Sequence, residues 1–192
     1  MLKTEKSIVR SEVAVRRKKF SLHEQEAANA AICRKLAEMP ELTGKDIAAY
    51  ASDGSEADLK EFIEGKITSG GKVILPRSNP DADSGYEMVE VKDLDSDLVP
   101  GKYNIPEPDK NLKAISPEEY DRYIWLIPGV AFDINGVRLG RGKGVYDKLL
   151  GTKRILVIGI FYEYQKFDLV PFEPHDRKIN IAVTEKSVYR FD

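Results

Sequence analysis

Cysteine and histidine are scarce in this sequence. Among its 192 residues, Cys33 is the only cysteine, and His23 and His175 are the only histidines. A single cysteine excludes an internal disulfide and a cysteine-based zinc site. No nucleophile is paired with either histidine in the sequence, so a Ser-His-Asp triad is not favoured. Cys33 lies among apolar helical positions, which predicts a core side chain and not a nucleophile.

Long apolar runs are also absent. No stretch approaches the roughly 20 apolar residues that cross a bilayer as a helix. The first residues, Met-Leu-Lys-Thr-Glu-Lys, lack the apolar region of a secretory signal. We therefore expect a cytoplasmic protein that does not enter a membrane. The length is typical of one domain, which we expect to span residues 1–192, and we expect a monomer.

An overall excess of one charge is missing, although charge is concentrated locally. The formal net charge is −2, yet residues 3–19 hold seven cations and two acids, and residues 138–154 hold six cations and one acid. Nucleic-acid binders are more often basic overall. The pattern therefore favours a compact anionic ligand and small-molecule substrates, with no nucleic acid. The run Arg16–Lys19 is expected to be solvated.

Helical and strand patterns alternate along the chain. The helical patterns cover residues 2–20 (with Ile8, Val9 and Val13 as an apolar stripe), the capping box at Ser21 up to Pro40, 55–67 with Ser55 as the cap, a start at Ser116, and 145–150. The strand patterns cover residues 46–51, 72–75, 86–91 (as an exposed strand), 123–127, 154–160 and 179–184, with a hairpin at Asn135-Gly136 and a loop at 100–108. This alternation predicts an α/β fold with a mostly parallel, Rossmann-like sheet flanked by helices on both faces.

The most informative segment is the heptapeptide Arg138–Gly144, which contains three glycines and three cations. The strand pattern at 123–127 precedes it and the helical pattern at 145–150 follows it. Glycines allow close approach to a ligand, a helix N-terminus offers N–H groups, and arginine or lysine adds charge. We interpret the segment as a polyphosphate site, with a solvated turn as the alternative. It matches neither the G-x-x-x-x-G-K-[S/T] nor the G-x-G-x-x-G pattern.

Phosphoryl transfer at such a site would need a divalent ion, and Mg²⁺ uses few protein ligands. Asp133, Asp147 and Asp176 are the candidate carboxylates. Asp147 lies three residues after Gly144, but an acid there also suits the helix dipole, so both roles stay open. His175-Asp176 by itself is a weak signal, with a loop cap as the alternative. Glu56 follows a strand, where ligands bind in open α/β sheets, although a dipole role is the alternative.

The run from Pro128 to Asp147, PGVAFDINGVRLGRGKGVYD, resembles the signature of the 5-formyltetrahydrofolate cyclo-ligase family. Weaker similarities follow in family order over nearly the whole chain. They are Lys6 to Arg10, Tyr50-Ala51 with Glu56, Leu75 to Arg77, Asn104 to Pro108, and Val170-Pro171 with His175-Asp176.

The resemblance implies an ATP- and Mg²⁺-dependent ring closure of 5-formyltetrahydrofolate to 5,10-methenyltetrahydrofolate, with ADP and phosphate released. It implies that Arg141 and Lys143 act in catalysis. It implies ATP contacts from Lys6, Arg10, Arg138, Leu139, Gly140, Arg141, Gly142, Lys143, Gly144, Val145 and Tyr146. It implies folate contacts from Arg10, Ala51, Glu56, Tyr103, Arg141, Gly142, Lys143, Gly144 and Val145, and Mg²⁺ ligation by Asp147 and Asp176.

Three positions depart from the family pattern. Val145 stands where many members have tyrosine, which leaves a backbone role at this position. Tyr103 stands where tryptophan is expected, although a ring for stacking is kept. Asn180 stands where an acid is common, so it is not assigned as a ligand.

Overall fold

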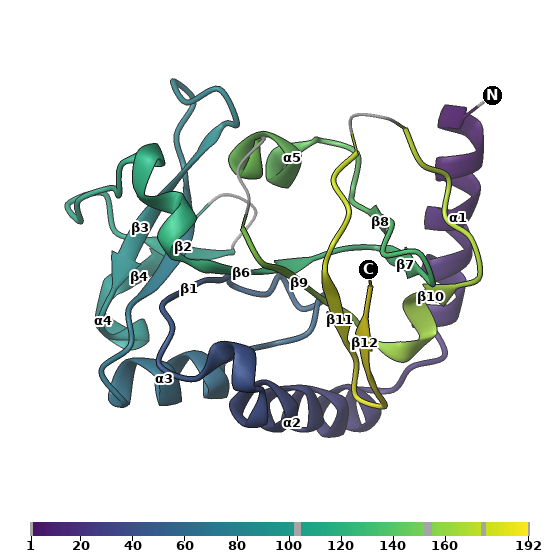
Figure 1. The fold of residues 1–192 in the computed structure, drawn as a ribbon, viewed down its shortest axis with the longest axis horizontal. Helices are drawn as coiled ribbons and strands as arrows, with labels where there is room; N and C mark the ends of the chain where they lie inside the picture. The colour runs from purple at the N-terminus through teal and green to yellow at the C-terminus, as the bar shows by residue number, and fades with distance from the viewer. Residues whose placement is uncertain (1, 102–104, 152–154, 174–175, 192) are drawn as a thin grey trace.

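The structure is a computed structural model, and it describes residues 2–101, 105–151, 155–173 and 176–191. Its centre is a seven-stranded sheet in the order β12-β11-β9-β6-β1-β2-β3 (Figure 1). The five inner strands are parallel and the two edge strands are antiparallel, which confirms the predicted mostly parallel sheet. The strands are β1 (Ile47–Ala48), β2 (Val73–Ser78), β3 (Tyr86–Val91), β6 (Ile124–Pro128), β9 (Val157–Ile160), β11 (Ile181–Val183) and β12 (Val188–Arg190).

Helices cover both faces of this sheet, as predicted (Figure 1). On one face, α2 (Leu22–Glu38) and α3 (Lys60–Thr68) pack through fully buried side chains such as Ile32 and Leu36. On the other face, α5 (Val145–Leu150) and the 3₁₀ turn η3 (Pro117–Arg122) pack around Trp125 and Leu150. Each face therefore has its own apolar core, as an α/β sheet buried on both sides requires.

The first helix, α1 (Leu2–Arg17), does not cover the main sheet. It packs on a small sheet of β10 (Lys166–Phe167), β7 (Ala131–Asp133) and β8 (Arg138–Leu139), next to the edge of the molecule in Figure 1. Val9 and Val13 form its buried stripe with Val137 and Leu139. Ile8 is 60% exposed, so its predicted place in that stripe was wrong. The packing brings the basic face of α1 beside the glycine segment.

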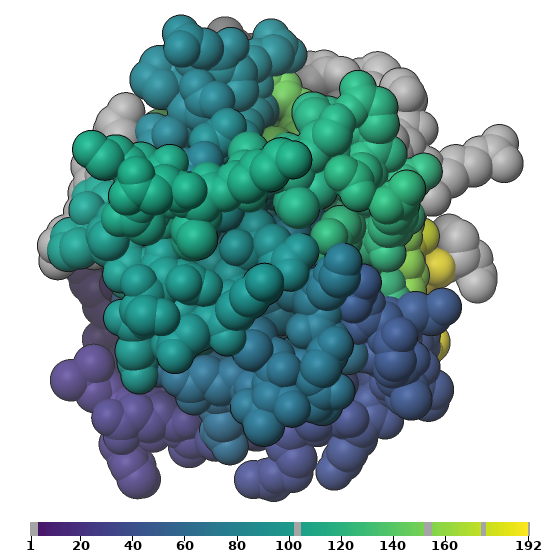
Figure 2. Space-filling view, turned by 90° about the vertical axis from the view of Figure 1, so that its left-hand side faces the viewer, coloured from purple at the N-terminus to yellow at the C-terminus, as the bar shows by residue number. Residues whose placement is uncertain are grey.

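The segment expected as a loop at 100–108 begins at the end of one short strand and ends in another. β4 (Leu98–Pro100) pairs antiparallel with β5 (Pro106–Pro108), next to the short helix α4 (Leu94–Asp97). The prolines that suggested a loop are tolerated because an isolated pair of edge strands leaves positions that need no N–H donor. Figure 2 shows this teal region lying above the blue segment of α3. The remaining short turns are η1 (Pro40–Leu42) and η4 (Glu163–Gln165).

Two other local predictions were wrong. Ser55 does not cap a helix, because α3 begins only at Lys60 and the backbone N–H of Lys60 is accepted by Asp58. The segment between β1 and α3 is a loop, and it turns at Gly54, where φ is +80°. The strand at 86–91 is not an exposed one: Met88, Val89 and Val91 are buried, because the sheet is covered on both faces here.

Candidate active site

The site lies where the chain reverses direction across the sheet. β1 and β6 are neighbours, but the connection after β1 leads through α3 to β2, whereas the chain after β6 leads through α5 to β9 on the other side. Such a switch point opens a crevice at the carboxyl ends of the two strands. Two loops border it: residues 50–56 after β1, and the glycine loop at residues 140–144 before α5.

A hairpin separates the predicted strand at 123–127 from the glycine loop. The main-sheet strand β6 ends at Pro128, and the β7–β8 hairpin is inserted before the loop. Its turn at Asn135-Gly136 was predicted, and Ala131 pairs with Leu139 across it. Gly136 has φ +73° there. The hairpin carries the glycine loop outward from the main sheet and against α1, while α5 begins at Val145 as predicted.

Arg141 of the glycine loop bridges the crevice. Its Nη1 lies 2.6 Å from Oδ2 of Asp53, and its Nη2 lies 3.0 Å from Oε1 of Glu56. The same Nη2 donates to Oγ of Ser55 at 2.6 Å. One guanidinium therefore joins the segment expected to bind phosphate to the carboxylate expected to bind folate. The sequence did not identify Asp53 or Ser55, because the Asp-Gly-Ser pattern signals only a turn.

The two carboxylates beside Arg141 differ in their affinity for a proton. Burial raises the pKa of Glu56 to about 7, with a further rise from Asp53, even though Arg141 favours the ionised form. Burial also opposes ionisation of Asp53, but hydrogen bonds from Arg141 and Ser55 outweigh it and hold the pKa well below its ordinary value. Arg141 thus has one permanently ionised partner and one partner that titrates near neutral pH.

We predict that Glu56 makes the protein less stable as pH rises. Its pKa is about 7 in the folded protein and ordinarily 4.5, so the folded state binds this proton more tightly. The stability contribution of the protonated form is lost as pH rises through that interval. As pH rises through that interval, the free energy of unfolding of the wild type should fall by about 3 kcal/mol more than that of a Glu56→Gln variant. This figure follows from ~1.4 kcal/mol per pKa unit. Urea titrations of both proteins between pH 4.5 and 8 measure it, and parallel pH profiles would contradict it.

Arg10 of α1 contacts the glycine loop directly. Its Nε donates to the carbonyl of Gly140 at 3.0 Å. A Cβ at Gly142 would lie 3.3 Å from Nη2 of Arg10, and Gly142 has φ +95°, so only glycine suits this position without strain. The loop backbone and a cation from another element are therefore already in contact.

Arg138 supports the loop from inside the protein. Its side chain is 4% exposed, and Nη2 contacts Oδ1 of Asp147 at 3.0 Å. Its guanidinium also lies 5.8 Å from the ring centre of Tyr146. Leu139 is buried in the cluster under α1. ATP contacts by Arg138, Leu139, Val145 and Tyr146 stay predictions; for Leu139, the side chain points to the core and the backbone would have to make the contact.

Lys6 connects α1 to the tail segment. Its Nζ contacts Oε2 of Glu173 at 2.5 Å and Oδ2 of Asp176 at 2.6 Å. Burial lowers the pKa of Lys6, but the hydrogen bonds to Asp176 and Glu173 outweigh it, and the pKa lies above its ordinary value. A predicted ATP ligand and a predicted metal ligand are thus brought together as an ion pair.

Within the described ranges, no group of three or more His, Cys, Asp or Glu side chains could hold a metal. Mg²⁺ in nucleotide sites is often held by one or two carboxylates together with phosphate oxygens and water. Asp147 and Asp176 each contact a cation of the protein, Arg138 and Lys6 respectively, and their side chains are 27% and 17% exposed. Their role as ligands stays a prediction.

A cavity of about 450 Å³ lies beside the loop after β1. Ala51, one of the predicted folate contacts, is in its wall with Tyr50 and Ser52. Pro100 of β4 and Pro106 of β5 also line it. The predicted residues Tyr103 and His175 lie outside the described residues.

No helix in the part of the chain that the structure describes is long and apolar enough to cross a membrane. His23 is exposed at the start of α2, and Cys33 is buried, as their sequence contexts predicted. Burial raises the pKa of the Cys33 thiol, which argues against a nucleophilic role.

Known proteins of one family match both this sequence and this fold. The profile of the 5-formyltetrahydrofolate cyclo-ligase family covers residues 2–185. The 5-formyltetrahydrofolate cyclo-ligase of Mycolicibacterium smegmatis is 31% identical over 76% of each chain, and that of Escherichia coli K12 is 27% identical over 88% of this chain and 93% of its own. The NMR structure of Aquifex aeolicus 5,10-methenyltetrahydrofolate synthetase superposes with a TM-score of 0.81 at 31% identity, covering 96% of this chain and 92% of that one. The chain belongs to the 5-formyltetrahydrofolate cyclo-ligase family.

Proposed function

We propose that this protein is an ATP- and Mg²⁺-dependent 5-formyltetrahydrofolate cyclo-ligase. It converts 5-formyltetrahydrofolate to 5,10-methenyltetrahydrofolate and releases ADP and phosphate. Family membership supports the reaction. The observation that carries the assignment to this site is the contact of Arg141, on the glycine loop, with Glu56 at the end of β1.

The proposed chemistry explains why a phosphate loop serves a ring closure. A formamide carbonyl is a poor electrophile, and its oxygen is a poor leaving group. Transfer of the γ-phosphoryl group to that oxygen forms an O–P bond, breaks the terminal P–O bond of ATP, and gives an iminophosphate. N10 then attacks the carbon and loses its proton, and the C–O bond breaks as phosphate leaves. The protein holds two substrates in line and neutralises charge.

The residues divide by the group they would contact. In this proposal, Arg10, Lys143 and the loop backbone hold the phosphates, and Arg141 contacts the oxygen that becomes phosphorylated. Glu56 hydrogen-bonds the pterin, with Ala51 and Tyr103 along the folate. Asp147 and Asp176 would hold Mg²⁺, which when bound neutralises phosphate charge. Lys6, Arg138 and the segment through Tyr146 complete the proposed ATP contacts.

The test is the absorbance of methenyl-folate with purified protein. Product formation that requires both ATP and 5-formyltetrahydrofolate supports the proposal. ADP formation without folate conversion would indicate another phosphotransferase. Binding that weakens steeply with salt and needs no Mg²⁺ would indicate a nucleotide- or RNA-binding protein. A single domain, a monomeric state and a cytoplasmic location stay predictions, and light scattering tests the second.

We predict that Lys143→Ala lowers kcat/KM for ATP by about tenfold, because one phosphate-binding charge is lost, at ~1.4 kcal/mol per factor of ten. Initial rates at varied ATP measure the effect. The matched control is Lys148→Ala, since Lys148 is exposed on α5 and its Nζ donates to the carbonyl of Asp83 at 3.0 Å. Equal rates for wild type and Lys143→Ala would remove Lys143 from the phosphate site.

A further inference from the structure

We propose that Asp53 is a positioning residue that holds Arg141 across the crevice during the reaction. Its carboxylate makes the ion pair with Arg141 at 2.6 Å, shorter than the 3.0 Å contact of Arg141 with Glu56. The side chain of Asp53 is 19% exposed and that of Arg141 is 47% exposed, so the carboxylate is the better shielded partner of this pair. The resemblance to the family assigned no role to Asp53.

The two oxygens of Asp53 have different partners. Oδ1 accepts from the backbone N–H of Ser55 at 2.9 Å and from Oγ of Ser55 at 2.6 Å. Oδ2 is left to Arg141. Gly54 forms the turn between the two residues with φ +80°. The carboxylate is thus fixed by its own loop before it meets the guanidinium, so the contact orients Arg141 with little loss of side-chain freedom.

A second carboxylate is needed because Glu56 has two roles. The inference rests on the proposed function, in which Glu56 hydrogen-bonds the pterin and so weakens its contact with Arg141. Asp53 and Ser55 do not face that conflict and keep Arg141 in place when folate binds. Their charges agree with this division, because Asp53 stays ionised over the whole working pH range, whereas the pKa of Glu56 is about 7.

The alternative is that Asp53 only stabilises its own turn through Ser55. The two roles differ in their coupling to Arg141. If Asp53 only stabilises its turn, substituting it should lower the activity by the same factor whether or not Arg141 is present. A positioning residue would matter only while Arg141 is present.

The experiment is a double-mutant cycle of Asp53→Asn and Arg141→Ala, measured as kcat and KM for methenyl-folate formation. We expect Asp53→Asn to lower kcat by about tenfold, through misplacement of the guanidinium, with KM for ATP within about twofold of wild type. Asp53→Asn should cause no further loss in the Arg141→Ala background. Asp53→Glu, which restores the charge, should recover part of kcat. The matched control is Asp46→Asn, since Asp46 likewise accepts a backbone N–H, from Lys72 at 2.9 Å, at the amino end of β1.

Two outcomes would overturn the inference: a kcat of Asp53→Asn within twofold of wild type, or an equal loss in both backgrounds. Wild-type turnover is measured first and decides the proposed function by itself. An inactive wild type therefore refutes the proposed function, whereas an active wild type with an unaffected Asp53→Asn variant refutes only the role of Asp53.

Discussion

Replacing Arg141 with alanine is expected to lower the rate of methenyl-folate formation by about 10²–10³-fold, the range measured when one charge-stabilising donor is removed from an active site. The guanidinium contacts Asp53, Ser55 and Glu56 and so joins both loops of the crevice. Its loss removes a cation at the reacting oxygen and leaves two carboxylates facing each other. Steady-state absorbance assays of methenyl-folate formation at saturating substrate concentrations measure the change in kcat.

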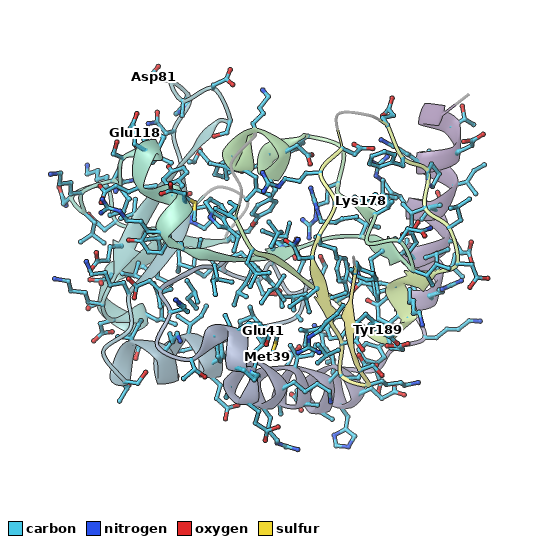
Figure 3. All side chains as sticks on the ribbon, in the orientation of Figure 1. Met39, Glu41, Asp81, Glu118, Lys178 and Tyr189 are labelled. Atoms are coloured by element: carbon cyan, nitrogen blue, oxygen red, sulfur yellow. The ribbon has the colours of Figure 1, made fainter. Side chains whose placement is uncertain are left out.

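Two variants make this result interpretable. Arg141→Lys keeps the charge but not the planar fork, so it should fall between wild type and Arg141→Ala. Arg190→Ala removes another guanidinium that pairs with a glutamate, at 2.8 Å from Glu41, and should leave the rate unchanged. Figure 3 shows Glu41 on the α2 side of the sheet, away from α5. A rate for Arg141→Ala within tenfold of wild type would exclude Arg141 from catalysis.

The second large effect is expected on stability. Asp147→Ala should lower the free energy of unfolding by about 3–5 kcal/mol, because it leaves a buried cation without its counter-charge. The Arg138 side chain is 4% exposed, and its Nε is buried without a hydrogen-bond partner among the described residues. Urea denaturation at pH 7, followed by circular dichroism, measures the loss.

The double variant Arg138→Met with Asp147→Leu provides the control. It should regain most of the stability, because apolar side chains replace the buried pair, but it should not regain turnover. Asp147→Asn separates the two roles of this residue, since the amide can still accept from Arg138 while it weakens any Mg²⁺ contact. A raised Mg²⁺ requirement would support ligation. An unchanged Mg²⁺ titration together with a stable protein would leave Asp147 as a structural partner only.

Local patterns predicted many elements well. The structure has β3 at Tyr86–Val91 and α5 at Val145–Leu150, the same bounds that the sequence suggested. The capping box at Ser21 is also present, with Glu24 as its partner. These features depend on residues a few positions apart, so the sequence contains all the interactions that form them. The predicted start of α3 at Ser55 was wrong. The backbone N–H of Ser55 donates to the side chain of Asp53, so Ser55 belongs to a turn and does not cap the helix.

Contacts between distant segments could not be predicted in the same way. Even the edge strand β12, which pairs with β11 through a tight turn, was not predicted, because no strong signal marks that turn. Arg141 meets Ser55 over a separation of 86 residues, because β1 and β6 lie side by side only after two crossovers have formed. No spacing rule relates such positions, so Asp53 and Ser55 could be found only in the folded protein.

The sequence by itself determined the class of fold and the strand–loop–helix around the three glycines, and it predicted an anionic ligand, because each inference depends on periodicity, backbone freedom or local charge. The tertiary structure decided what each cation does. Arg138 and Arg141 are three residues apart and alike in charge, but their side chains are 4% and 47% exposed. The hairpin turns the first into the protein, where it pairs with Asp147, and carries the second across the crevice to the loop after β1.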